Sequence, residues 1–396
     1  MAETLKLDAL IFGGGVAGLW LLNRLRNEGY NVWLMEQDQL GAGQSIASQG
    51  MIHGGIKYSL GGKLTNASSA IADMPAHWKH CLKGEGDVDL RGCNLLSDSY
   101  YMWPRHSFRS RLNAFLGSKA LEAKVGKISS ENYPDFFKNN IKSALYQLQD
   151  IVLDVPSLLH TLAEKHQEAI FKIDWQQAEL EKNTDGSIKE LKFSNGTVIE
   201  ARHYIFCCGA GSESLMKENQ FDFTKMQRRP LQMVMVKHAI EDPVYVHCVS
   251  DKLTMTPEVT ITSHRTAAGE PVWYLGGELA EHGALQSEGE LIEAARNKLT
   301  TLFPWCDFSK ASWGTFAIDR AEEKQSDGSR PDDISIAEFD NLMLCWPTKL
   351  TLAPNLANTV LNKMQTANTI AGNSAEPSPP EFFQRPDIAS PPWEQF

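Results

Sequence analysis

The pattern of apolar and polar positions is most regular near the N-terminus. Leu7 to Phe12 is a mostly apolar run with the length of a buried strand. Ala17 to Asn27 has the apolar spacing of a helix, and Asn31 to Glu36 is a second short apolar run. Strand, helix and strand in this order predict a βαβ unit with two parallel strands.

Later segments also show strand and helix periods. Ala178 to Cys208 contains three runs separated by Asp-Gly and Asn-Gly pairs, which predicts a three-stranded meander. Gln227 to Gly277 alternates without a helical period, which predicts an antiparallel sheet. Asn94 to Trp103 reads as a strand pair. Helices are predicted for Glu288 to Phe303 and for Pro354 to Met364.

Glycines punctuate the first βαβ unit at the spacing G-x-G-x-x-G. Gly13 allows a tight turn, Gly15 lets a pyrophosphate approach the backbone, and Gly18 lets helix and strand pack closely. The helix N-terminus then faces the anion. Glu36 follows 18 residues after Gly18, where a carboxylate can accept hydrogen bonds from ribose hydroxyls. The sequence therefore predicts a dinucleotide site.

Composition narrows the class of protein. A chain of 396 residues is long enough for two domains, and a net charge of −11 argues against general nucleic-acid affinity. No run of 18 apolar residues occurs, so no transmembrane segment is expected. The seven cysteines form no C-x-x-C pair, and the first strand begins almost at once, which leaves no room for a leader. We therefore expect a cytoplasmic protein.

A stretch rich in small residues follows Glu36. Its backbone can lie against a flat ligand, and Ser45 and Ser48 can form hydrogen bonds to phosphate or ring atoms. His53, Lys57 and Tyr58 emerge from this background of small residues. Their clustering predicts a reactive centre.

This stretch, S-x-x-S-x-G-x-I-H-G-G-I-K-Y, resembles the FAD-dependent D-amino-acid-oxidase-like superfamily. The nearest branches are the glycerol-3-phosphate dehydrogenases, with H-G-G-x-R-Y here, and the L-2-hydroxyglutarate oxidases, with I-H-x-G-I-x-Y. The chain has lysine where the first branch has arginine. The buried run Tyr204 to Ser212, which ends in G-A-G-S, is similar to the superfamily strand beside the cofactor.

A further resemblance lies near the C-terminus. Lys349-Leu350-Thr351 is similar to the G-G-K-x-T-T segment of glycerol-3-phosphate dehydrogenases. Pro347 and Thr348 replace the two glycines, and the following Ala-Pro resembles the amino-acid-oxidase branches instead.

The resemblance implies an α/β fold in which a Rossmann-like FAD-binding domain, with a parallel sheet and a β-meander, carries an α+β substrate domain on an antiparallel sheet. The FAD domain is expected to comprise residues 1–80, 150–225 and 315–371, and the substrate domain 81–149 and 226–314. Residues 372–396 form a Pro-rich tail that packs on the body through its aromatics or contacts a partner.

The resemblance also implies FAD as the cofactor and a specific set of contacts. His238, His247 and His264 do not have metal-ligand spacing, so no metal is expected. His53 is expected to be the catalytic base, to pack against the flavin or to carry it covalently. Arg320 either binds the anionic end of the substrate or forms a salt bridge with Glu322 or Glu323, and Lys349 contacts substrate and flavin or lies on the surface. Lys57 and Tyr58 complete the substrate site. Cofactor contacts are expected from Gly13, Gly15, Val16, Ala17, Gly18, Glu36, Gln37, Gln44, Ser45, Ser48, Gln49, Gly50, Met51, Cys208, Gly209, Gly211, Lys349, Leu350 and Thr351.

The expected activity is oxidation of a small anionic hydroxy substrate, a 2-hydroxy acid or glycerol 3-phosphate, by hydride transfer to flavin N5. An amino-acid or secondary-amine oxidase is the alternative. A non-catalytic binding module, as in the Rab-escort relatives of flavoproteins, is disfavoured by the intact glycine fingerprint. An NAD enzyme is disfavoured by the β-meander. Oxygen, a quinone and a carrier protein all stay open as electron acceptor.

Overall fold

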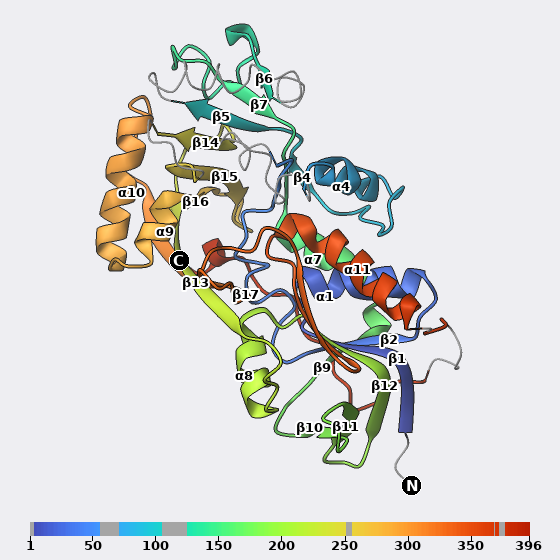
Figure 1. The fold of residues 1–396 in the computed structure, drawn as a ribbon. Helices are drawn as coiled ribbons and strands as arrows, with labels where there is room; N and C mark the ends of the chain where they lie inside the picture. Colours follow the sequence, from blue (N-terminus) through green and yellow to red (C-terminus); the bar gives the residue numbers. More distant parts are fainter. Residues whose placement is uncertain (1–3, 56–70, 105–124, 251–255, 368, 372–376) are drawn as a thin grey trace.

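The computed structural model describes residues 4–55, 71–104, 125–250, 256–367, 369–371 and 377–396. Two eight-stranded sheets form the two halves of the molecule, and a small three-stranded sheet belongs to neither. Figure 1 shows the first sheet in the lower half and the second in the upper half, joined by the long strands β13 (Met226–Lys237) and β17 (Ser312–Glu323).

The first sheet contains the predicted βαβ unit and the predicted meander. β12 lies beside β1, β1 beside β2 and β2 beside β9, all in parallel, while the meander and the β18–β19 pair are antiparallel. The strands are β1 (Thr4–Phe12), β2 (Val32–Glu36), β9 (Ile170–Lys172), β10 (Ala178–Lys182), β11 (Ile188–Phe193), β12 (Val198–Phe206), β18 (Ser335–Phe339) and β19 (Leu342–Trp346).

Helices pack on this sheet through apolar faces. α1 (Val16–Asn27) contacts α7 (Val155–Glu164) and α11 (Ala353–Thr366). The buried Asn23 amide donates to the Leu162 carbonyl at 2.8 Å, which joins α1 to α7. Trp20 lies 4.5 Å, centroid to centroid, from Trp78 of α4 (Met74–Leu82). α8 (Ser212–Glu218) follows the meander.

The second sheet is mainly antiparallel, as its alternation predicts. α10 (Glu288–Leu302) covers it, begins at a Ser287–Glu290 capping box and buries Leu291, Ala295 and Leu299. The shorter α9 (Glu278–Gly283) packs against β13. In sheet order the strands are β17, β13, β16 (Pro271–Gly276), β15 (Val259–Arg265), β14 (Val246–Val249), β5 (Tyr100–Pro104), β7 (Tyr146–Leu148) and β6 (Val125–Lys127).

One sequence prediction about strands was wrong. The predicted pair within Asn94 to Trp103 is instead two strands in different sheets, because β4 (Leu95–Ser97) pairs with β8 (Ile151–Leu153) while β5 pairs with β14 and β7. β17 pairs with β13 along its whole length. β17 therefore crosses the predicted boundary at 315 as one continuous strand of the second sheet. The domain boundaries stay predictions.

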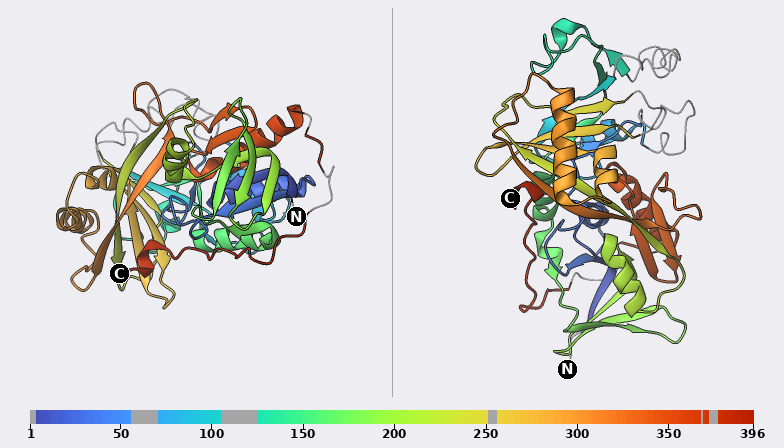
Figure 2. Two further views of the ribbon diagram at one scale, coloured as in Figure 1. Left: turned by 90° about the horizontal axis from the view of Figure 1, so that it is seen from below. Right: turned by 90° about the vertical axis from the view of Figure 1, so that its left-hand side faces the viewer.

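The C-terminal segment 377–396 packs along both halves (Figure 2). The Phe383 ring contacts Trp33 and Phe171 at the first sheet. Leu40 then forms a short parallel bridge with Ile388. In the second sheet, Trp393 is buried and stacks on His264 with 4.2 Å between ring centroids. Burial lowers the pKa of His264 to about 3, so this ring is neutral under the tryptophan near neutral pH.

Replacing Trp393 with alanine is expected to release the end of this segment. The change removes a fully buried indole, which costs about 3–5 kcal/mol in a packed site. Limited proteolysis followed by mass spectrometry would show faster cleavage after residue 377. Phe382→Ala is the control, because Phe382 is 45% exposed. Equal cleavage rates in the two variants would contradict the anchoring role of Trp393.

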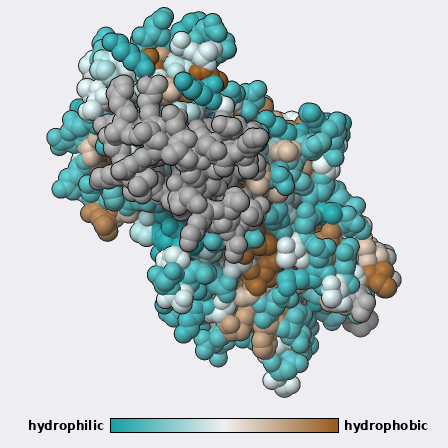
Figure 3. Space-filling view, turned by 45° about the horizontal axis from the view of Figure 1, so that its top comes forward, coloured by the Kyte–Doolittle hydropathy of each residue, from teal (hydrophilic) through white to brown (hydrophobic). Residues whose placement is uncertain are grey.

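On the coloured part of the face drawn in Figure 3, brown side chains form small separate groups among hydrophilic ones. Among the helices of the described residues, none combines the length and the apolar character that a bilayer-spanning helix needs.

Candidate active site

A large cavity lies where the two halves meet. Its volume is about 1110 Å³, above the roughly 300–1,000 Å³ of common small-ligand pockets. The first half contributes the glycine turn after β1, the loop after β2 and the end of β12, while β13 and β17 contribute the opposite wall. The segment Pro347 to Ala353 closes one side. The space is large enough for an extended ligand together with a second, small one.

The glycine turn has the geometry that its spacing predicts. Gly13 has φ +102°, and a Cβ there would lie 2.6 Å from the Cys207 carbonyl oxygen. A Cβ on Gly18 would lie 2.0 Å from the Gly13 oxygen, so only glycine allows this approach of α1 to the turn. At Gly15 the nearest atom to such a Cβ is Ser45 Oγ at 3.0 Å. Gly15 thus leaves backbone accessible at the N-terminus of α1, where the helix dipole favours an anion.

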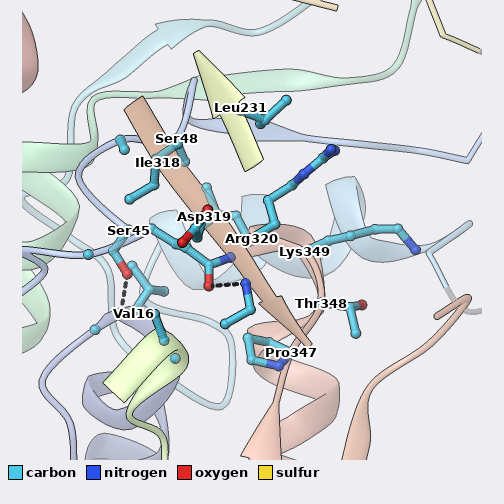
Figure 4. A pocket seen from close by; sticks show the side chains of 18 of the residues that line it. Val16, Ser45, Ser48, Leu231, Ile318, Asp319, Arg320, Pro347, Thr348 and Lys349 are labelled. Carbon is cyan, nitrogen blue, oxygen red and sulfur yellow. Dashed lines mark hydrogen bonds between the residues drawn. The ribbon is translucent and has the colours of Figure 1, made fainter. Parts of the chain in front are cut away.

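Polar groups of the following loop fix this end of the cavity. Glu36 Oε2 accepts from the Gly14 amide at 2.6 Å, and its Oε1 accepts from the Asp38 amide at 2.9 Å. Ser45 Oγ accepts from the Val16 amide at 2.9 Å, drawn as a dashed line in Figure 4. Each oxygen of the Glu36 carboxylate can accept one further hydrogen bond.

Most of the predicted cofactor residues line this cavity. Gly18 and Gly50 do not, and both act through the backbone: Gly50 has φ +69°, and a Cβ there would lie 2.1 Å from the Leu153 oxygen. Burial raises the pKa of the Cys208 thiol well above its usual value, so this residue offers a neutral wall. The predicted residues that line the cavity are Gly13, Gly15, Val16, Ala17, Glu36, Gln37, Gln44, Ser45, Ser48, Gln49, Met51, Cys208, Gly209, Gly211, Lys349, Leu350 and Thr351.

Arg320 lies on β17 and lines the wall from the second half. Register places it opposite Arg229 of β13, whose guanidinium is paired with Glu322. Arg320 therefore does not use Glu322; its Nη1 lies 3.3 Å from Glu281 Oε1 of α9. Burial and the neighbouring Arg229 lower the pKa of Arg320. Two arginines therefore lie side by side in this partly buried wall, each beside one glutamate.

Lys349 lies on the rim of the same cavity. Its ammonium donates to the Asp332 carbonyl at 2.7 Å, and in Figure 4 its side chain and that of Arg320 extend to the same side of β17. The preceding Thr348 has φ +58°, which is unfavourable for a β-branched residue. The segment that Lys349-Leu350-Thr351 resembles has a glycine at this position, and glycine adopts such a φ without strain. Lys57 and Tyr58 lie outside the described residues.

His53 is buried at the base of the cavity. Its amide donates to Thr351 Oγ1 at 3.0 Å, and its Nδ1 lies 2.9 Å from Asp150 Oδ2. Sequence reasoning missed Asp150, because it is 97 positions away and precedes a segment with an ordinary scaffold pattern. The pairing of two short apolar runs, Met51–Ile52 and Ile151–Leu153, could have indicated it.

Two groups of described residues place donor atoms close enough to share a metal ion: His53 with Asp150 and His247, and His77 with Cys81 and Asp87. In the second group, His77 Nε2 lies 2.9 Å from Asp87 Oδ1, and Arg24 Nε lies 3.6 Å from Asp87 Oδ2. The expectation of a metal-free protein stays a prediction.

The whole-chain comparisons agree with this architecture. The model of the family DAO, FAD dependent oxidoreductase, matches residues 8–344. A probable FAD-dependent oxidoreductase of Pseudomonas aeruginosa is 41% identical over 100% of this chain and 99% of its own. Its crystal structure superimposes with a TM-score of 0.85, covering 100% of this chain and 99% of that one.

More distant structures share the fold. Glycine oxidase from Geobacillus kaustophilus has a TM-score of 0.64 at 14% identity, with 94% of this chain and 100% of that chain covered. L-α-glycerophosphate oxidase from Mycoplasma pneumoniae, with FAD bound, has a TM-score of 0.64 at 16% identity, with 97% and 99% covered. The predicted fold class, the FAD cofactor and the assignment as an oxidoreductase are therefore confirmed. The chain belongs to the DAO family of FAD-dependent oxidoreductases.

Proposed function

We propose that this oxidoreductase acts on a small anionic hydroxy compound, such as a 2-hydroxy acid or glycerol 3-phosphate. The observation that carries the proposal is Arg320, a partly buried cation on the cavity wall beside a second arginine. Only one carboxylate contact, to Glu281 at 3.3 Å, is described for its guanidinium. Carboxylate and phosphate oxygens match the paired donors of a guanidinium.

The residues present suit the proposed position of FAD. The N-terminus of α1 and the open Gly15 would hold the pyrophosphate, and Glu36 would accept from a ribose hydroxyl. Ser45, Ser48 and the backbone of Cys208 to Gly211 would line the remainder. When bound, FAD supplies the acceptor for the hydride that leaves the substrate carbon.

His53 is the proposed base for the substrate hydroxyl. It lines the cavity, it is a residue type that titrates near neutral pH, and Asp150 holds one of its ring nitrogens. Arg320 holds the anionic end of the substrate, which fixes the hydroxyl relative to the base. Lys349 is proposed as a second cation at the rim, with Lys57 and Tyr58 as further substrate contacts.

An amine substrate is the second candidate, and Glu281 favours it. Its carboxylate lines the cavity next to Arg320, so the pair offers an acceptor for an ammonium beside a donor for a carboxylate. A zwitterionic amino acid needs that combination. The family includes enzymes of both kinds among the structures similar to this chain.

Matched substrate pairs would decide between the two. Each pair consists of a hydroxy acid and the amino acid with the same carbon skeleton, with glycerol 3-phosphate added, and an artificial dye accepts the electrons. The proposal predicts a higher kcat/KM for the hydroxy member of each pair. Faster oxidation of the amino members would overturn it in favour of amine oxidation.

Replacing Glu36 with alanine is expected to weaken FAD binding about 10- to 100-fold. This corresponds to the loss of one charge-assisted hydrogen bond of about 1.5–3 kcal/mol. FAD fluorescence during titration of the apoprotein would give the dissociation constant. Glu28→Ala, at the exposed end of α1, is the control. A constant unchanged from wild type would rule out the ribose role of Glu36.

The electron acceptor stays open between oxygen, a quinone and a carrier protein, and a location in the cytoplasm stays a prediction.

A further inference from the structure

A short antiparallel strand pair places a buried carboxylate opposite His53. Met51 pairs with Val152 and Ile52 with Ile151 in the antiparallel pair β3 (Met51–Ile52) and β8. The next positions in this register are His53 and Asp150. The short sheet therefore sets the histidine directly opposite the carboxylate.

The Asp150 carboxylate contacts the histidine segment with both oxygens. Oδ2 lies 2.9 Å from His53 Nδ1, and Oδ1 accepts from the Gly54 amide at 2.8 Å. Asp150 is 3% exposed and His53 8% exposed, so water screens this contact little. Contacts with two neighbouring residues, His53 and Gly54, fix the direction of the carboxylate.

An ionised carboxylate only accepts hydrogen bonds, so His53 Nδ1 must be the donor in this contact. The neutral imidazole then carries its proton on Nδ1, and Nε2 has the lone pair. Thr351 Oγ1 holds the His53 amide from the side of α11. Nε2 therefore lies on the side of the ring away from Asp150, in a residue that lines the cavity.

Among the described residues, titratable groups of the second sheet also lie near the pair. The His247 ring of β14 is stacked 6.1 Å from the His53 ring, and Tyr100 of β5 lies 4.5 Å from His247. Burial raises the pKa of Tyr100 well above its usual value, so it stays neutral. His247 Nδ1 lies 3.0 Å from Thr260 Oγ1. The carboxylate of Asp150 is thus the negative charge placed against His53 among the described residues that face it.

We propose that Asp150 is a positioning residue that keeps His53 in its Nδ1–H form and stabilises the imidazolium. The inference rests on the proposed role of His53 as base. The O–H bond of the substrate breaks, the proton forms an N–H bond at Nε2, and the resulting positive charge lies beside Asp150. Without the carboxylate, the other tautomer presents a proton to the substrate and cannot act as base.

The test compares wild type with Asp150→Asn by two readouts. Selective 15N-histidine labelling, with His53 assigned from a His53→Gln spectrum, reports the tautomer without any substrate. We expect Nδ1–H in wild type and a shift toward Nε2–H in the variant. With an anionic substrate, we expect flavin reduction to slow about 10- to 100-fold. The acidic limb of the curve of reduction rate against pH should move to lower pH, because the imidazolium loses its counter-charge.

Asp154→Asn is the matched control, because that carboxylate lies four residues further along and caps α7 through the Ser157 amide at 3.0 Å. It should leave both readouts at wild-type values. An unchanged His53 signal in Asp150→Asn, or a stoichiometric divalent metal found in the purified protein and lost in the variant, would overturn the pairing. A tautomer shift in a protein whose flavin no hydroxy substrate reduces would support the pairing and refute the proposed function.

Discussion

Replacing His53 with glutamine is expected to slow reduction of the bound flavin by substrate about 10²- to 10⁴-fold, the usual contribution of a positioned base. Glutamine retains a polar side chain of similar length but cannot take the proton of a hydroxyl group. The change leaves Gly13, Glu36 and Ser45, which belong to the proposed FAD contacts, unaltered. FAD should therefore stay bound in the variant.

Anaerobic stopped-flow absorbance of the flavin measures this rate directly, and the spectrum before mixing reports FAD content. His160→Gln is the control, because that histidine side chain is 67% exposed on α7. A variant that keeps FAD and reduces it at the wild-type rate would show that His53 does not act as base.

Arg320→Gln is expected to lower kcat/KM for an anionic substrate about 10²- to 10³-fold, mainly through KM. Removing one partner of a desolvated charge pair costs about 3–4 kcal/mol, which corresponds to that ratio. Lysine would not restore the activity, because it cannot form the two parallel hydrogen bonds of a guanidinium. Glu281 would lose its partner as well, which adds a negative charge to the wall.

Steady-state kinetics with each anionic substrate and with its uncharged amide or dephosphorylated analogue would isolate the charge effect. The substitution should lower kcat/KM much less for the analogue than for the anion. Arg228→Gln provides the control, because Arg228 also lines the cavity but is paired with both Glu213 and Asp319. Equal losses for the anion and its analogue would contradict the anion-binding role.

Local pattern was sufficient for much of the fold. Apolar runs, turn residues and helical spacing within a short window predict the βαβ unit, the meander and α10. The glycine spacing predicted which positions need no side chain, and Gly13 and Gly18 have neighbours that exclude a Cβ. The elements and the Gly13–Gly18 contact depend on residues close in sequence, whereas the atom that excludes a Cβ at Gly13 is the carbonyl oxygen of the distant Cys207.

Features that depend on register between distant strands were not predictable in this way. Asp150 reaches His53 because β3 pairs with β8, and Arg320 belongs to the second sheet because β17 pairs with β13. The sequence also does not predict the direction of a long side chain. Lys349, for example, donates to the Asp332 carbonyl at the rim of the cavity. Such pairings are decided by packing of the whole chain.

The measurement that tests the central claim most directly is the visible spectrum of the purified wild-type protein, recorded without oxygen before and after addition of 2-hydroxy acids and glycerol 3-phosphate. The account predicts a flavin spectrum that one of these anions bleaches. A flavin spectrum that only amino acids or secondary amines bleach would contradict the proposed substrate class. A colourless protein that does not take up added FAD would contradict the assignment of the cavity itself.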